Sequence, residues 1–382
     1  MEKIDLFKVY MSPNAGIEVS KVLNSGYIGQ GKKVEEFEDK LKKHFEYDYI
    51  QTLNSGTSAL HMALHLLKKP DYDYNWNGLN DGDEVLTTAM TCTATNWPIL
   101  ANNLKIKWVD IDPNTLNMDL DDLERKITPN TKVIMLIHWG GYPNDIDRVK
   151  KIQNKSFELY GFKPAIIEDA AHAFGSKYKG NYIGTNGNLT MFSLQAIKHL
   201  TSIDGGLLFS PNINLHKRGK LIRWYGIDRD NNQKDFRCES NIEEWGFKFH
   251  MNDVCATVGI ENLKEVDNII SKHRSNAKYY DNNLKNIKGL ELLKREEGFE
   301  SSFWIYSMLV ENRDDFYKYM KECNITVSQV HERNDKHTTV KEFISPLPTL
   351  DKTIKKIVSI PVGWWITNEQ REYIFNCIKK GW

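Results

Sequence analysis

The sequence predicts an α/β protein built on a largely parallel β-sheet. Short apolar runs alternate with amphipathic segments at helical spacing, which is typical of repeated strand–helix units. Two of the apolar runs, 133–138 and 165–169, are continuous rather than alternating, as expected for strands buried on both faces. They end in His138 and in Glu168-Asp169, at the sheet edge where α/β proteins bind ligands.

The predicted elements follow one another regularly through the first two thirds of the chain. Turn residues separate them, such as Ser25-Gly26 after the first helix and Asp81-Gly82-Asp83 before a strand. Strands are expected at 49–53, 84–88, 105–110, 133–138, 165–169, 189–194 and 206–209. Helices are expected at 14–24, 34–45, 59–67, 91–100, 119–126, 146–160, 217–224 and 254–263.

The length of 382 residues predicts two domains, because a chain of this size is too long for one simple core. We expect a large domain over 1–264, including the N-terminal segment. A smaller α+β domain would cover 265–382. It would begin with a long linking helix at about 266–284 and contain a strand at 304–310 and helices at 313–322 and 368–379.

The composition excludes several classes of protein. Lysine plus arginine and aspartate plus glutamate both number 51, so no net charge favours nucleic acid or a membrane surface as a partner. The five cysteines are scattered and form no CxxC pair, so neither a disulfide framework nor a metal site is expected. No secretory signal pattern and no membrane-length apolar run is present, so we expect a cytoplasmic protein.

Two stretches suggest a ligand site. Asn54 to Ser58 (NSGTS) lies between a predicted strand and a helix, where backbone N–H groups can bind an anion. By itself this stretch could equally be an ordinary helix cap. Lys198 lies on a short connection between two buried strands, where its charge must be paired or its amine must take part in chemistry. A solvated loop lysine is the alternative.

Asp169, at the end of a predicted strand, is the third component of the candidate ligand site. An anion site, a buried carboxylate and a lysine together suit pyridoxal 5′-phosphate (PLP). The phosphate requires backbone donors and hydroxyls, the pyridine nitrogen requires a carboxylate, and the aldehyde requires a lysine amine that can form a Schiff base. The same lysine could then move a proton between substrate and cofactor.

The chain resembles the DegT/DnrJ/EryC1/StrS family of PLP-dependent sugar aminotransferases, of the aspartate aminotransferase fold type I. The resemblance covers nearly the whole chain, and it implies a mostly parallel seven-stranded sheet in the large domain. It is carried, in family order, by residues 25–31, 34–38, 54–60, 82–85, 109–112, 168–173, 192–206, 246–253 and 359–362.

The resemblance also implies residue roles. Lys198 would form the Schiff base, Asp169 would pair with the pyridine nitrogen, and His172 would stand near the ring hydroxyl. A homodimer with shared active sites is implied too. The cofactor phosphate would be held by Ser55, Gly56, Thr57 and Ser193, with Lys248 contributed by the partner subunit.

One position departs from the family pattern. The family places an aromatic ring over the cofactor where this chain has Cys92, so that stacking would be lost or supplied elsewhere. We interpret Cys92 as a structural cysteine beside the cofactor site.

The resemblance implies a transaminase. Related sugar 3-dehydratases replace the Schiff-base lysine with histidine, whereas this chain keeps Lys198. We expect L-glutamate to donate its amine, through PLP, to a nucleotide-linked 4-keto-6-deoxyhexose in amino-sugar biosynthesis. A 3-keto sugar, the dehydratase reaction and a PLP-binding regulatory protein are the alternatives. Candidate residues of the substrate pocket are Trp139, Tyr142, Trp224, His331 and Arg333.

Overall fold

The computed structural model describes residues 2–71, 76–229 and 241–382. Its centre is a seven-stranded sheet in the order β1-β9-β8-β5-β4-β2-β3. Only β9 runs against the other six strands, so the sheet is mostly parallel, as predicted. The strands are β1 (Ile50–Leu53), β2 (Glu84–Thr88), β3 (Lys105–Val109), β4 (Thr131–Ile137), β5 (Ala165–Asp169), β8 (Leu189–Ser193) and β9 (Gly206–Phe209).

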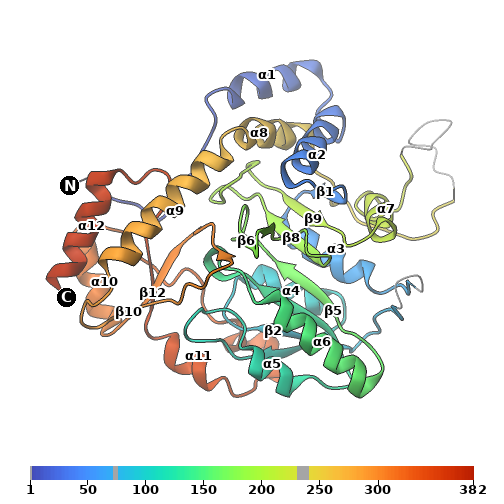
Figure 1. The fold of residues 1–382 in the computed structure, drawn as a ribbon. Coiled ribbons are helices and arrows are strands. Elements are labelled where there is room, and N and C mark those ends of the chain that lie inside the picture. Colours follow the sequence, from blue (N-terminus) through green and yellow to red (C-terminus); the bar gives the residue numbers. More distant parts are fainter. Residues whose placement is uncertain (1, 72–75, 230–240) are drawn as a thin grey trace.

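Helices cover both faces of this sheet (Figure 1). Alternate residues of one strand enter different cores, since Ile167 packs in one core and Ile166 in the other. On the face of Ile167 lie α3 (Gly56–Leu66), α4 (Thr93–Ala101) and α7 (Ile213–Ile222). On the face of Ile166 lie α2 (Lys32–Phe45), α5 (Leu120–Lys126), α6 (Ile146–Tyr160) and α8 (Asp253–Leu263), and α1 (Ala15–Ser25) packs on α8.

The C-terminal part has its own core around an antiparallel sheet, β10-β12-β13. The long helix α9 (Val266–Asn283) leads into it, and both chain termini lie there (Figure 1). Ile4 is buried in this core and pairs with Ile325, so the first residues pack on the C-terminal part although we grouped them with 1–264. The other elements of this part are β10 (Leu290–Leu292), β12 (Tyr306–Val310), α10 (Arg313–Glu322), α11 (Pro348–Thr353), β13 (Ile357–Ile360) and α12 (Asn368–Lys380).

A third, small sheet joins distant parts of the chain: β6 (Lys177–Tyr178) pairs with β7 (Asn181–Tyr182) and with β11 (Phe299–Glu300). None of the helices within the described residues is long and apolar enough to cross a membrane.

Two helix starts differ from the prediction because of their caps. The Ser55 side chain accepts a hydrogen bond from the N–H of Ser58, so α3 begins at Gly56 rather than at residue 59. Asn212 caps α7 in the same way through the N–H of Leu215, and that helix starts four residues earlier than expected.

Candidate active site

Three segments meet at the carboxyl ends of the parallel strands. They are the start of α3 after β1, Asp169 at the end of β5, and the connection after β8 that carries Lys198. The start of α4, after β2, lies beside them, because Thr95 contacts Asp169. This is the edge at which α/β sheets bind ligands.

The start of α3 is packed tightly against the strands behind it. A Cβ on Gly56 would lie 3.0 Å from Met191 Sδ and 3.3 Å from Ser193 Cβ, and one on Gly206 would lie 2.3 Å from the Ser55 carbonyl oxygen. The N–H groups of Gly56 and Thr57 lie in the first turn, where the helix supplies no acceptor. Gly56, Thr57 and Ser193 therefore lie together as an anion cradle, with Ser55 as its cap.

Asp169 is a buried carboxylate held by two donors. The Thr95 hydroxyl donates to Oδ2 at 2.6 Å, and the N–H of Ala171 donates to Oδ1 at 3.0 Å. Burial raises the pKa of Asp169, and these hydrogen bonds and the charge of Lys198 oppose that rise only in part. Lys198 is near enough for its charge to act on Asp169. A cationic group placed directly against Asp169 would favour the ionised carboxylate further.

Lys198 faces an aromatic cluster. Its Nζ lies 3.7 Å from the ring centroid of Trp304, and Trp304 stacks on His172 with centroids 3.9 Å apart and planes at 19°. Burial lowers the pKa of Lys198 to about 8, although the charges of Asp169 and Cys92 oppose the shift. A substantial fraction of the amine is therefore free near neutral pH.

Two neutral histidines extend the cluster. Burial holds the pKa of His172 well below its ordinary value and lowers that of His331 to about 4. Their Nε2 atoms are 3.5 Å apart. The ring of Trp139 meets both edge-on, at centroid distances of 6.0 Å and 5.8 Å. Lys198, His172, His331 and Trp139 are thus brought together.

Three of the predicted substrate residues have other partners. Arg333 forms ion pairs with Asp335 and Asp351, so its guanidinium is already engaged. The Tyr142 ring stacks on Phe299, and its hydroxyl accepts a hydrogen bond from the N–H of Glu296. Trp224 contacts His250 and Arg229. These contacts engage Arg333 and give Tyr142 and Trp224 no link to Lys198, so the place of all three in a substrate pocket stays a prediction.

Cys92 and Lys248 both lie near the start of a helix at the site. Cys92 is exposed at the N-cap of α4 and lies near Lys198, beside the site as predicted by position, while its structural role stays a prediction. The carbonyl of Lys248 accepts a hydrogen bond from the Asn54 side chain, which places its backbone beside the start of α3 in its own chain. Its contribution to a partner subunit stays a prediction.

Two residues of the site were not predicted. Thr95 lies in the first turn of α4 and Thr91 just before its cap, with their hydroxyls 2.8 Å apart, so a Thr-x-x-x-Thr spacing after a strand was the available signal. Trp304 lies more than 100 positions beyond Lys198 in the chain, and no local pattern marks it.

The residues present fit PLP. The anion cradle suits a phosphate, the buried Asp169 suits a protonated ring nitrogen, and Lys198 has the free amine that an aldehyde requires. Trp304 is an aromatic ring beside the lysine, at a site where Cys92 cannot stack.

Comparisons with known proteins agree with this description. Residues 12–379 match the sequence profile of the DegT/DnrJ/EryC1/StrS aminotransferase family. The crystal structure of AtS13 from Actinomadura melliaura superposes with a TM-score of 0.95, at 45% identity and over 100% of both chains. That of the sugar aminotransferase CalS13 from Micromonospora echinospora gives 0.93, at 40% identity and over 99% of each chain. A UDP-4-amino-4-deoxy-L-arabinose–oxoglutarate aminotransferase of Shewanella sediminis is 28% identical, over 90% of this chain and 89% of its own.

Proposed function

Because the chain belongs to the DegT/DnrJ/EryC1/StrS family of PLP-dependent aminotransferases, we propose that it moves the amino group of L-glutamate, through PLP, to a nucleotide-linked 4-keto-6-deoxyhexose. The observation that carries the proposal is Lys198, whose pKa of about 8 leaves a reactive amine close to the buried Asp169. A sugar as acceptor is supported by the likeness to a sugar aminotransferase. The relative from Shewanella sediminis is an oxoglutarate aminotransferase of a 4-amino sugar nucleotide, which supports amination at C4 and glutamate as the amine donor.

The chain's own residues divide the work. PLP, when bound, would supply an electron sink and a carrier for the amine. The N–H groups of Gly56 and Thr57, with the Ser193 hydroxyl, would bind the phosphate. Asp169 would hold the proton on the ring nitrogen, and Lys198 Nζ would accept and return the proton at the substrate carbon.

The cluster beside Lys198 would receive the sugar. His331 is uncharged at neutral pH and would offer its imidazole to a neutral hexose. Trp139 is buried, with its indole N–H donating to Ser307, and it would support His172 and His331 edge-on from behind. His172 would orient the cofactor, because Trp304 fixes its ring from one side. These assignments retain His331 and Trp139 from the sequence prediction and leave out Arg333.

We further propose that the chain works as a homodimer with shared active sites. Several apolar side chains at the N-terminal end are exposed, among them Ile17 at 59%, Leu23 at 53% and Tyr27 at 84%. An exposed apolar group of this kind is typical of a protein interface. Lys248 of the partner subunit would then contact the phosphate.

Two alternatives are less well supported. A sugar 3-dehydratase of this family would carry histidine at the position of Lys198. A PLP-binding regulatory protein would need no proton-transferring residue, whereas this chain has a free amine beside a buried carboxylate.

The test is amine exchange with a panel of sugars. The protein is incubated with PLP, L-glutamate and either 4-keto or 3-keto sugars linked to UDP, GDP or dTDP. We expect 2-oxoglutarate and an amino sugar, detected by mass, to form in equal amounts with a 4-keto substrate, and Lys198→Ala to form neither. If no keto sugar consumed glutamate, the proposal would be wrong, and a 3-keto preference would reassign the aminated carbon.

A further inference from the structure

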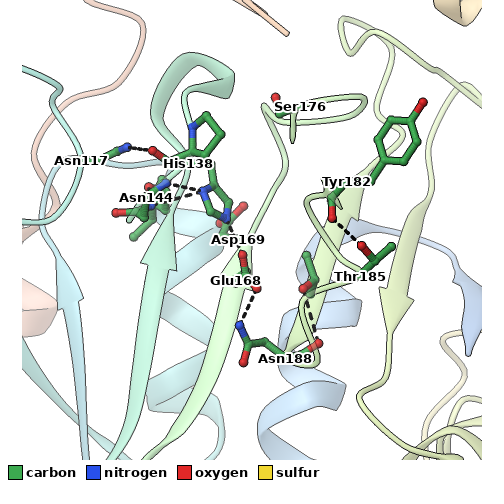
Figure 2. Close-up of polar contacts among 12 residues, drawn as sticks. Asn117, His138, Asn144, Glu168, Asp169, Ser176, Tyr182, Thr185 and Asn188 are labelled. Carbon is green, nitrogen blue, oxygen red and sulfur yellow. Dashed lines mark hydrogen bonds and ion pairs between the residues drawn. The ribbon is translucent and has the colours of Figure 1, made fainter. Parts of the chain in front are cut away.

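A buried polar network crosses the carboxyl ends of β4 and β5, on the face of the sheet opposite Asp169 (Figure 2). His138 Nε2 lies 2.8 Å from Glu168 Oε2, and both side chains are fully buried. The Asn188 side chain donates to Glu168 Oε1 at 2.7 Å. We call His138 and Glu168 the buried pair.

The hydrogen bonds fix where the proton of the pair resides. The backbone N–H of Asn144 donates to His138 Nδ1 at 3.1 Å, and a backbone N–H cannot act as an acceptor. Nδ1 therefore carries no proton, and the proton of the neutral imidazole lies on Nε2, directed at Glu168. Glu168 thus accepts from His138 and from Asn188 and is a carboxylate. The buried pair carries one negative charge.

This negative charge lies next to Asp169, the predicted partner of the cofactor ring nitrogen. Glu168 and Asp169 are consecutive residues of β5, so their side chains leave the strand on opposite faces. The two strands are also tied at this point, since the N–H of His138 donates to the Asp169 carbonyl at 3.1 Å. No function described above uses the buried pair, although burying an ion is costly.

We propose that His138 and Glu168 are positioning residues for the cofactor: their buried negative charge favours a protonated ring nitrogen against Asp169. The proposal rests on the proposed function, because it presupposes that PLP binds with its ring nitrogen at Asp169. The two carboxylates add to one another in attracting the positive ring, and Thr95 keeps Asp169 aimed at it. His138 neutralises neither of them; it supplies the donor that keeps Glu168 ionised within the protein.

The test compares PLP with 1-deaza-PLP, an analogue in which the ring nitrogen is replaced by C–H. Full-length apoprotein is titrated with each compound, and the ratio of the two dissociation constants is measured. Glu168→Gln keeps the shape and the acceptor for His138 but removes the charge. We expect Glu168→Gln to reduce the preference for PLP over 1-deaza-PLP roughly tenfold. This is the size expected when a unit charge about 10 Å from the ring nitrogen is removed at an effective dielectric constant of about 20. If Glu168 had only a structural role, Glu168→Gln would weaken the binding of PLP and of 1-deaza-PLP equally, and the ratio of the two dissociation constants would not change.

Matched variants keep the test decisive. Glu84→Gln removes a carboxylate at the opposite end of the same sheet, where it pairs with Lys107, and should leave the ratio unchanged. If Glu168→Gln does not fold, two substitutions at His138 test the same proposal. His138→Leu removes the donor that keeps Glu168 ionised and should reduce the ratio, whereas His138→Gln can still donate and should preserve it.

The outcomes separate this inference from the proposed function. A wild-type protein that binds no PLP would contradict the proposed function. If the wild-type protein prefers PLP but Glu168→Gln leaves the ratio unchanged, only the role of the buried pair is overturned. The same conclusion follows from an unchanged ratio in His138→Leu if Glu168→Gln does not fold.

Discussion

The Lys198 amine is expected to react with PLP at a pH far below that of an ordinary lysine. Burial lowers its pKa from 10.5 to about 8. At pH 7.5 a group with a pKa of 8 is about one quarter free amine, against about 0.1% for a pKa of 10.5, so the reactive fraction rises roughly 200-fold. The site itself therefore prepares the amine.

The assay follows the visible absorbance of lysine-bound PLP after mixing with apoprotein at pH 6 to 10. The initial rate should rise with pH to a midpoint near 8 once the titrations of PLP itself are corrected for. Those titrations are taken from the rate with Nα-acetyl-lysine, divided by the free-amine fraction of that ordinary lysine. Asp169→Asn removes the charge that favours the ammonium form, so the midpoint should move to lower pH. A midpoint near 10 in the wild type would refute the argument that burial activates this lysine.

Three further predictions concern neighbouring residues. Thr95→Val removes a charge-assisted donor from Asp169 and should weaken PLP binding by about 1.5–3 kcal/mol, whereas Thr91→Val, one hydroxyl further away, should cost clearly less; equal losses would contradict the role of Thr95. Asp169→Asn should make the apoprotein more resistant to urea than the wild type at pH 8, and the difference should be smaller at acidic pH. The pKa of Asp169 is raised in the folded protein, so its ionisation lowers the free energy of unfolding as the pH rises through that pKa; a variant less stable than the wild type at both pH values would contradict this. Arg333→Met should lower the free energy of unfolding by about 3 kcal/mol and leave KM for the sugar nucleotide unchanged, and a raised KM at unchanged stability would restore Arg333 to the substrate pocket.

Much of the fold could be predicted from the sequence because short apolar runs alternate with segments of helical periodicity, separated by turn residues. The strands at 84–88, 165–169 and 206–209 and the helices at 146–160 and 313–322 have the predicted bounds. The short strands β6, β7 and β11 were not predicted, since two residues carry no periodicity and their pairing depends on contacts between distant segments. The burial of Ile4 against the C-terminal core is a contact of the same kind.

The site could be predicted in part. Asp169, Lys198 and the start of α3 were identifiable because they lie at the end of a strand or on the connection that follows one, and parallel strands bring their carboxyl ends together. Arg333 illustrates the limit, because its ion-pair partners, Asp335 in a short 3-10 turn and Asp351 in α11, are set by the tertiary fold and not by a local sequence pattern. The tautomer of His138 is likewise set by the backbone of Asn144, which no sequence pattern reports.

The central claim is that Lys198 is the residue that binds PLP covalently. The most direct measurement is reduction of the PLP-loaded protein with borohydride, followed by proteolysis and peptide mass mapping. We expect a phosphopyridoxyl group on the peptide that contains Lys198, and its loss in Lys198→Ala. A label on another lysine, or a label that persists in Lys198→Ala, would contradict it.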